Sequence, residues 1–348
     1  MFFKKEFTEI VRDAWRDYDG DSRPVKSIAD ISAKVSTNHV FMIELENRER
    51  VIGKLSYFGN FENFLEDHTL INALALNLPA PYEYFVSHSL TKQSQVYTYR
   101  YVDSMLDAWV VFYKPIRVSK MLPRKLSTKQ ITRLGEEVAK FHKTCTSLSG
   151  VLPLWSKTMS SDLNQLKEIL QTEVGQFEHR GNEQIIHEQV DTLFKNMEAL
   201  GADDFKTIPV FVDWNIGNFS IDEGGNFYSR WDYDWFRMSS RIMDFYFFSR
   251  VCSSAGDKTF FSYLIDPLME PRFMTFLKAY HRVFPLTEQE VLFMKEAYRF
   301  FILNYVIKDG RYFFHEIYAG RLQMEAYSSY FPNIDKFDAS PILKELGI

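Results

Sequence analysis

Two kinds of hydrophobic pattern divide the chain. Residues 38–57, "NHVFMIELENRERVIGKLSY", form two apolar runs around a polar turn, which predicts a β-hairpin. The next stretch, "ENFLEDHTLINALALNLPAP", places Leu65, Leu70 and Leu74 on one helical face and stops at two prolines. "EYFVS" and "SQVYTYRYVD" then have the composition of strands. The pattern predicts a first region, residues 1–103, of strands and one helix.

Beyond residue 103 the apolar positions recur mostly at helical spacing. "STKQITRLGEEVAKFHKTC" opens with a capping box of Ser127 and Gln130, and "TEQEVLFMKEAYRFFILNYVI" opens with Thr287 and Glu290. Helices are also expected over residues 161–200 and in "FMTFLKAYHRVF" and "RYFFHEIYAGRLQMEAY". One polar hairpin interrupts them, so the second region, residues 104–348, is predicted to be helical with an isolated hairpin.

That hairpin, "PVFVDWNIGNFSIDEGGNFYSRWDYDW", carries the most informative polar residues. Asp213 and Asn218 lie in a loop between two apolar strands, and Asp232 lies at the end of a third. A tight turn at Gly224-Gly225 brings Asp232 back beside the other two. Asn218 and Asp232 then supply hard oxygen ligands suited to Mg²⁺, and Asp213 can position a substrate hydroxyl. The alternative is that these residues only form turns, which Asp and Asn favour.

A cation that could face these oxygens is Lys54, at the end of the apolar strand "VIGKLS". Phosphoryl transfer from ATP needs a cation on the phosphates, metal ligands and a carboxylate for the attacking hydroxyl. Lys54 is predicted to bind the phosphates, held by Glu66 of the following helix, with Glu62 as the substitute partner. The alternative is a lysine at a strand end that extends into water.

The segments "FVDWNIGN", "RWDYDW" and "RIMDFYFF" resemble the catalytic loop, metal aspartate and later Asp-containing pair of the aminoglycoside phosphotransferase/choline kinase family. The resemblance covers residues 25–320, approximately. It implies an α+β, protein-kinase-like two-lobed fold, with a small β-rich N-terminal lobe and a larger, mostly helical C-terminal lobe. It also implies that Asp213 is the catalytic base and that Asp244 braces the catalytic loop.

The resemblance further implies that the turn before Asn38 covers the nucleotide phosphates, although "AKVSTNHVF" has no glycine there. Without glycine the backbone approaches phosphate less closely, so the hydroxyls of Ser36 and Thr37 are expected to contribute with Asn38. We expect the adenine to meet a hinge at the end of the first lobe, formed by Arg100, Tyr101 and Asp103.

Phe211 and Val212 stand where the family usually has His and Gly. The expected activity is Mg²⁺-dependent transfer of the γ-phosphoryl group of ATP to a hydroxyl of a small molecule. These departures keep a second hypothesis open, a pseudokinase that senses nucleotide or binds a partner. A protein Ser/Thr kinase of the same family would differ only in its acceptor.

Aromatic residues concentrate around the loops, among them Trp214, Trp231, Tyr233 and Trp235. They either pack the hairpin against the helices or provide a face for a cationic acceptor, with Asp234 as its counter-charge. The acceptor class expected is a hydroxyl-bearing small molecule, such as an amino alcohol, a sugar or an aminoglycoside.

Composition limits the classes of partner that we expect. The 348 residues carry a formal net charge of −5 without a long basic stripe, which argues against nucleic-acid binding. Two cysteines are too few for a disulfide framework, and no apolar run has the length of a membrane span. We therefore expect a soluble, cytoplasmic protein with no membrane partner.

Overall fold

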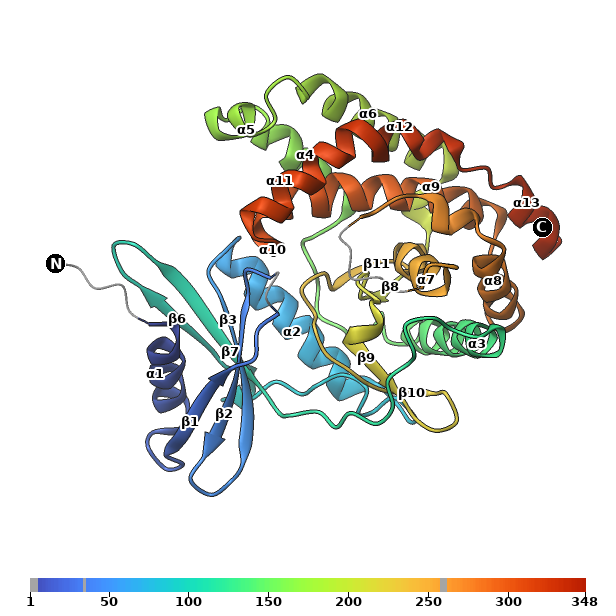
Figure 1. Cartoon of the computed structure of the whole chain (residues 1–348). Coiled ribbons are helices and arrows are strands. Elements are labelled where there is room, and N and C mark those ends of the chain that lie inside the picture. The colour runs from blue at the N-terminus through green and yellow to red at the C-terminus, as the bar shows by residue number, and fades with distance from the viewer. Residues whose placement is uncertain (1–5, 34–35, 257–261) are drawn as a thin grey trace.

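The computed structural model describes residues 6–33, 36–256 and 262–348, which form a small lobe and a larger helical lobe (Figure 1). The small lobe is built on an antiparallel sheet of five strands in the order β1-β2-β3-β7-β6. These strands are β1 (Val25–Asp30), β2 (His39–Leu45), β3 (Arg50–Ser56), β6 (Thr98–Val102) and β7 (Asp107–Tyr113). A short hairpin, β4 (Thr91–Lys92) with β5 (Gln95–Val96), precedes β6.

Two helices cover this sheet, α1 (Phe7–Asp19) and α2 (Phe61–Asn77) (Figure 1). The predicted hairpin β2–β3 and the predicted helix α2 are confirmed. Helix α1 was not predicted, although Ile10, Val11, Ala14 and Trp15 are buried at helical spacing. It packs on the sheet with β-strand residues of a core that is separate from the main one.

The boundary placed after residue 103 is wrong. The segment that follows, "DAWVVFY", forms β7, which lies between β3 and β6 in the sheet of the small lobe. Its side chains are almost all buried because the strand is interior, and an interior strand shows a continuous apolar run in place of alternation. The small lobe therefore extends to Tyr113, and residues 114–126 connect it to the helical lobe.

The helical lobe confirms the α+β class and both predicted capping boxes, at Ser127 and Thr287. The region expected to be helical over residues 161–200 divides into three helices. The α-helices of this lobe are α3 (Thr128–Cys145), α4 (Met159–Ile169), α5 (Glu173–Glu178), α6 (Glu183–Leu200), α7 (Phe245–Cys252), α8 (Pro271–Val283), α9 (Glu288–Phe301), α10 (Gly310–Phe313), α11 (Glu316–Glu325), α12 (Phe331–Asn333) and α13 (Ser340–Leu346).

Two short strand pairs lie within this lobe. The predicted hairpin is β9 (Phe219–Ile221) with β10 (Phe227–Arg230), closed by a turn in which Gly225 takes φ +80°. The second pair, β8 (Thr207–Val210) with β11 (Arg237–Ser240), joins residues before and after the hairpin. The two pairs together hold the loop 211–218 and the loop 231–236 at one place.

The helix after Thr287 was predicted to be continuous, but its second half changes type. Helix α9 passes into the π-helix η5 (Ile302–Lys308), and a second π-helix, η6 (Ala326–Tyr330), follows α11. Short π-segments often occur at functional sites because they alter which side chains a helix presents. Within the described ranges, no helix combines the length and apolar character that a bilayer crossing requires.

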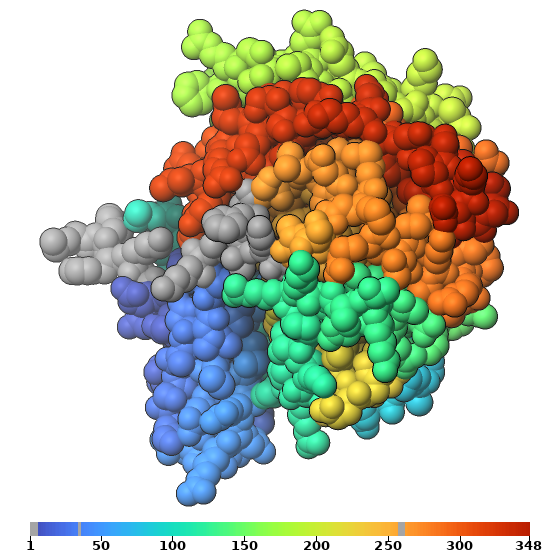
Figure 2. All heavy atoms as spheres, turned by 45° about the vertical axis from the view of Figure 1, so that its right-hand side comes forward, coloured from blue at the N-terminus to red at the C-terminus, as the bar shows by residue number. Residues whose placement is uncertain are grey.

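Helices α3 and α8 approach each other closely at Gly135, and their surfaces adjoin in the space-filling view (Figure 2). A Cβ atom at Gly135 would lie 2.5 Å from the main-chain oxygen of Phe276 and 3.1 Å from Cβ of Ala279. Both neighbours belong to α8, so relief of the clash requires the helices to move apart.

Gly135→Ala is therefore expected to lower the free energy of unfolding by roughly 1 to 3 kcal/mol, despite the better helix propensity of alanine. The control is Gly320→Ala in α11, where nothing lies within 4 Å of the added atom. There the same substitution should raise stability by about 0.5 to 1 kcal/mol. Urea denaturation measures both, and equal effects at the two sites would contradict this account of the helix contact.

Candidate active site

The loop between β8 and β9 places Asp213 and Asn218 in direct contact. The Asp213 carboxylate accepts a hydrogen bond from the Asn218 amide at 3.0 Å and from the main-chain N–H of Asn215 at 3.2 Å. Across the hairpin, the N–H of Trp231 donates to the main-chain oxygen of Asn218 at 3.0 Å. Asp232 follows Trp231, so the fold brings the three predicted residues Asp213, Asn218 and Asp232 to one site.

Asp244 fixes this loop from below. Its Oδ1 accepts the main-chain N–H groups of Phe211 at 3.0 Å and Val212 at 2.7 Å, and its Oδ2 contacts Nε2 of His142 at 3.0 Å. The other nitrogen of His142 contacts the Tyr280 hydroxyl at 2.9 Å. Asp244, His142 and Tyr280 are completely buried. The bracing role expected of Asp244 is present, and His142 is part of it, which the sequence did not indicate.

Val212 and Phe211, the two residues of the loop that depart from the resembled family, differ in how they are accommodated. Val212 has φ +62°, a left-handed conformation that glycine adopts freely and a β-branched residue adopts only under strain. Phe211 is buried among the rings of Phe141, Trp214 and Phe236. At the two positions where the resembled family has histidine and glycine, this chain therefore has a packed aromatic ring and a strained main chain.

Arg230, at the end of β10, is another residue of the site that the sequence did not indicate. Its side chain is completely buried and donates to the main-chain oxygens of Asp213 at 2.7 Å and Asp232 at 3.3 Å. The guanidinium lies over the rings of Phe211 at 4.2 Å and Trp214 at 4.5 Å. Arg230 thus ties the two loops together and stacks on the phenylalanine that replaces histidine. The sequence signal that could have identified Arg230 is a charged residue at the end of a predicted strand whose other residues are mostly buried.

Burial and nearby charges together determine the pKa of Asp213. Burial and, after it, the charge of Asp232 raise the pKa of this half-buried carboxyl to about 7, and Arg230 opposes the change. A carboxyl that titrates near neutrality can accept a proton from a hydroxyl and release it again.

Lys54 extends from β3 towards the helical lobe, but Glu66 is not its partner. Lys54 pairs with Asp234, which also accepts a hydrogen bond from the Asn38 amide at 2.8 Å. Burial lowers the pKa of Lys54, and the charges of Asp232 and Asp67 oppose this effect. Lys54 therefore lies within the electrostatic reach of the proposed metal aspartate.

Glu66 instead accepts the main-chain N–H of Ser156 at 2.8 Å, while the next residue, Asp67, pairs with Lys157. Consecutive helical residues point about 100° apart, so α2 can direct only one of these carboxylates into the space beside Lys54. It directs Asp67 there, and Glu66 connects the lobes. The substitute Glu62 is exposed at the start of α2.

The turn expected to cover phosphates contacts the helical lobe. Ser36 bridges to Phe314, and its hydroxyl accepts the N–H of Asn38 at 3.1 Å. Thr37 donates its N–H to the oxygen of Phe313 at 3.3 Å and its hydroxyl to the oxygen of Tyr312. These groups are used by the chain itself in this structure. Residues 34 and 35 of this turn lie outside the described residues.

The hinge prediction is wrong in position. Arg100 pairs with Asp107 across β6 and β7 at 2.6 Å, and Asp103 caps the turn between those strands and accepts a bond from Tyr101. The strands pair antiparallel, so this turn lies at one end of the sheet while the connection to the helical lobe leaves from the other. That connection begins at Lys114, next to a cavity of about 690 Å³.

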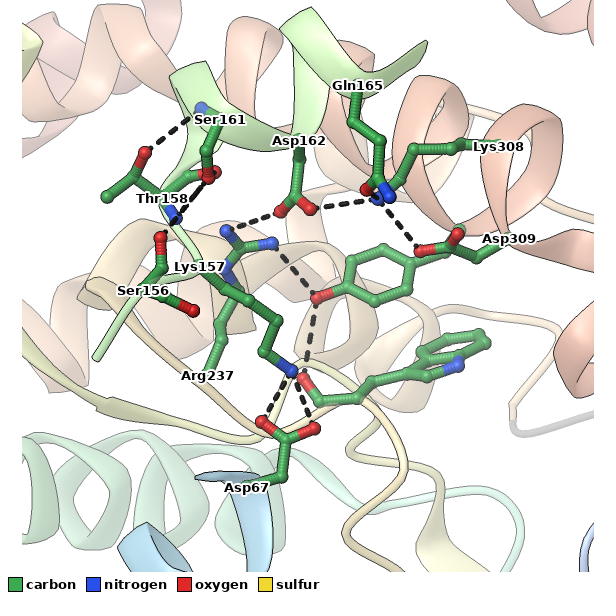
Figure 3. A network of polar contacts seen from close by, with 12 residues as sticks. Asp67, Ser156, Lys157, Thr158, Ser161, Asp162, Gln165, Arg237, Lys308 and Asp309 are labelled. Carbon is green, nitrogen blue, oxygen red and sulfur yellow. Dashed lines mark hydrogen bonds and ion pairs between the residues drawn. The ribbon is translucent and has the colours of Figure 1, made fainter. Parts of the chain in front are cut away.

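A second cavity, of about 340 Å³, lies between the lobes and reaches Lys54 and Asp234. Its walls come from α2, the start of α4, residues 233–237, the π-helix η5 and α10. Figure 3 shows the ion pairs along it, with Lys157 on Asp67 and with Arg237 and Lys308 on either side of Asp162. Asp213 does not line this cavity.

The predicted metal ligands are compatible with Mg²⁺ that arrives with a nucleotide. The Asn218 amide uses its NH₂ group on Asp213, which leaves its oxygen for a cation, and Asp232 is exposed. In the part of the chain that the structure describes, no three His, Cys, Asp or Glu residues gather into a ready-made metal site. Mg²⁺ commonly takes one or two protein oxygens and completes its shell with water and phosphate.

Solved structures show which fold this is. An amicoumacin kinase in complex with AMP-PNP and Ca²⁺ matches with a TM-score of 0.65 at 14% identity, over 98% of this chain and 100% of that one. A microcompartment-associated aminopropanol kinase matches at 0.58, 14% identity and 98% of both chains. The choline kinase LicA from Streptococcus pneumoniae matches at 0.52, 14% identity, 96% of this chain and 100% of its own.

No family profile and no curated protein sequence matches the chain. The structural likeness at this identity establishes a shared fold over nearly the whole length. The two-lobed fold expected from the sequence resemblance is thereby confirmed.

Asp244→Ala is expected to lower the free energy of unfolding by roughly 3 to 5 kcal/mol, because it leaves two buried N–H groups and His142 without their partner. The control Asp203→Ala removes an exposed carboxylate of the same lobe and should change stability by less than about 0.5 kcal/mol. Urea denaturation followed by tryptophan fluorescence measures both. A small effect of Asp244→Ala would contradict the bracing role.

The free energy of unfolding of Val212→Gly should exceed that of Val212→Ala by about 0.5 to 1 kcal/mol, because only glycine adopts the left-handed conformation without strain. The control is Val251, which is equally buried inside α7. There the free energy of unfolding of the alanine variant should exceed that of the glycine variant by about 1 kcal/mol. The same order at both positions in thermal or urea unfolding would show that residue 212 is not strained.

Proposed function

We propose that this chain, whose fold is that of kinases acting on small molecules, transfers the γ-phosphoryl group of ATP to a hydroxyl of a small molecule. The observation that carries the proposal is the gathering of Asp213, Asn218 and Asp232 on one loop pair, with Lys54 of the opposite lobe within electrostatic reach. Lys54 binds the phosphates, and Asn218 and Asp232 hold Mg²⁺. The metal neutralises phosphate charge when bound.

Asp213 is the group assigned to the acceptor. It holds the attacking hydroxyl by a hydrogen bond and takes its proton as the new bond to the γ-phosphorus forms and the bond to the leaving ADP oxygen breaks. Its pKa, raised to about 7 by burial, makes it a better proton acceptor than an ordinary aspartate. Asp244 and Arg230 keep its main chain in place.

Before nucleotide can bind in this way, Lys54 must exchange Asp234 for a phosphate. The ion pair between them, and the hydrogen bonds of Thr37 to α10, are the features that favour the second hypothesis, a binding module without turnover. The enzyme hypothesis is supported by the gathering of Asp213, Asn218 and Asp232 on one loop pair, where burial also raises the pKa of Asp213.

Asp213→Asn is expected to reduce ATP turnover roughly 100- to 10,000-fold, because an amide cannot accept the proton. The affinity for ATP with Mg²⁺, measured by thermal shift or calorimetry, should stay within a few-fold. The control Glu223→Gln, an exposed residue in the turn of the same hairpin, should leave both quantities unchanged.

Unchanged turnover in Asp213→Asn would overturn the role given to this residue. A wild-type protein that binds ATP only with Mg²⁺ but turns over none, with every acceptor tested, would favour the binding module. An acceptor that proves to be a protein serine or threonine would identify the third hypothesis.

A further inference from the structure

The cavity between the lobes is lined by equal numbers of acidic side chains and of Lys or Arg side chains. Its lining includes four carboxylates and four Lys or Arg side chains, and the buried His68 has a pKa lowered well below its usual range, mainly by burial, and is neutral. The carboxylates are Asp67, Asp162, Asp234 and Asp309, and the cations are Lys54, Lys157, Arg237 and Lys308.

Each of these charges already has a partner within the cavity. Lys54 pairs with Asp234 and Lys157 with Asp67. Asp162 accepts from Arg237 at 2.9 Å and from Lys308 at 2.8 Å, and Lys308 also lies 3.2 Å from Asp309 (Figure 3). A cationic ligand would therefore have to break an ion pair that is largely withdrawn from water, and a broken buried pair leaves one charge uncompensated.

Two of the carboxyls are, in addition, less ready to receive a cation. Burial raises the pKa of Asp67 and of Asp309, and the attached lysines only partly oppose this. Asp234, which the sequence offered as a counter-charge for a cationic acceptor, is shared by Lys54 and Asn38.

Two uncharged side chains in the same cavity have hydrogen-bonding capacity that the chain does not use. Asn304, in the π-helix η5, is 4% exposed, and its side-chain oxygen has no hydrogen-bond partner. A buried acceptor without a donor is rare in native structures and indicates a ligand group or a water. Gln165, an exposed residue, receives Lys308 on its oxygen at 3.0 Å, so its NH₂ group remains to donate to a ligand or to water.

The aromatic lining completes the site. Trp235 and Tyr312 contribute apolar faces beside Asn304 and Gln165 in the lining of one cavity. Its volume of about 340 Å³ is enough for a small ring compound. A hydroxyl group both donates and accepts, so a molecule with several hydroxyls can satisfy the oxygen of Asn304 and the NH₂ group of Gln165 together.

We propose that the half of this cavity formed by α4 and the π-helix η5 is the acceptor subsite, and that it selects an uncharged molecule rich in hydroxyls over a cationic amino alcohol. The proposal rests on the kinase function proposed above. The reacting hydroxyl would extend past Asp234 towards Asp213 once Lys54 has exchanged Asp234 for phosphate. In this half Asp162 and Asp309 keep Arg237 and Lys308 as partners even when Lys54 leaves Asp234, so the groups left for an acceptor are the oxygen of Asn304 and the NH₂ group of Gln165.

The test uses acceptor pairs that differ in one group: glucose with glucosamine, and propane-1,2-diol with 1-aminopropan-2-ol. Formation of ADP from ATP and Mg²⁺ is followed with the wild-type protein at fixed ATP. In each pair that is phosphorylated, kcat/KM should be at least 10-fold higher for the neutral member. Preference for the ammonium member, or turnover with no neutral hydroxyl compound of a wider sugar and polyol panel, would overturn the proposal.

Three variants test whether Asn304 and Gln165 contact the acceptor. Asn304→Leu and, independently, Gln165→Leu should raise the KM for the neutral acceptor at least 10-fold and leave the KM for ATP unchanged. Asn304→Asp, which adds an unpaired carboxylate, should shift preference towards the ammonium member. The control Gln184→Leu changes an exposed amide of α6 and should alter neither KM.

Each variant is first checked by thermal unfolding, and two independent leucine variants keep the test valid if one fails to fold. An unchanged acceptor KM in both would overturn the subsite. The two proposals fail differently. Absence of Mg²⁺-dependent ATP binding would overturn the kinase function itself, whereas ATP turnover confined to cationic acceptors would overturn only the acceptor class.

Discussion

The position of the loop that carries Asp213 depends on one buried carboxylate. Asp244 binds the main-chain N–H groups of Phe211 and Val212, and these residues immediately precede Asp213. A buried charge is tolerated only when hydrogen bonds replace the lost water, and here two N–H groups and His142 do so. The direction of the Asp213 side chain is therefore set by a contact that never touches a substrate.

The loop above Asp244 shows how unusual residues can occupy a functional framework. The left-handed conformation at Val212 costs free energy, yet the bonds to Asp244 on one side and Arg230 on the other fix the main chain there. Arg230 itself is desolvated and is accommodated by the rings of Phe211 and Trp214. Phe211 and Arg230 are thus one packed unit, and each residue explains the presence of the other.

Sequence reasoning succeeded where the determining interactions are local. The turn at Gly225, the two capping boxes and the convergence of Asp213 with Asn218 follow from residues a few positions apart. It failed where the interaction joins the lobes. Asp234 lies 180 positions from Lys54, so nothing near Lys54 distinguishes it from the local candidate Glu66. The hinge was misplaced for a different reason, because a fully buried strand lacks alternation.

The inter-lobe contacts share one property that bears on how the site is used. Asp234 on Lys54, Lys157 on Asp67 and Thr37 on α10 all close the space between the lobes with groups of the chain itself. A phosphate that reaches Lys54 takes the place of Asp234 on that cation, and Asp234, which stays in the chain, keeps only its hydrogen bond from Asn38. In the half of the cavity formed by α4 and the π-helix η5, by contrast, Asp162 and Asp309 keep Arg237 and Lys308 as partners, so an ammonium ion there would have to break one of these pairs. The proposed preference for an uncharged acceptor therefore depends on the pairs made by Asp162 and Asp309, which do not involve Lys54.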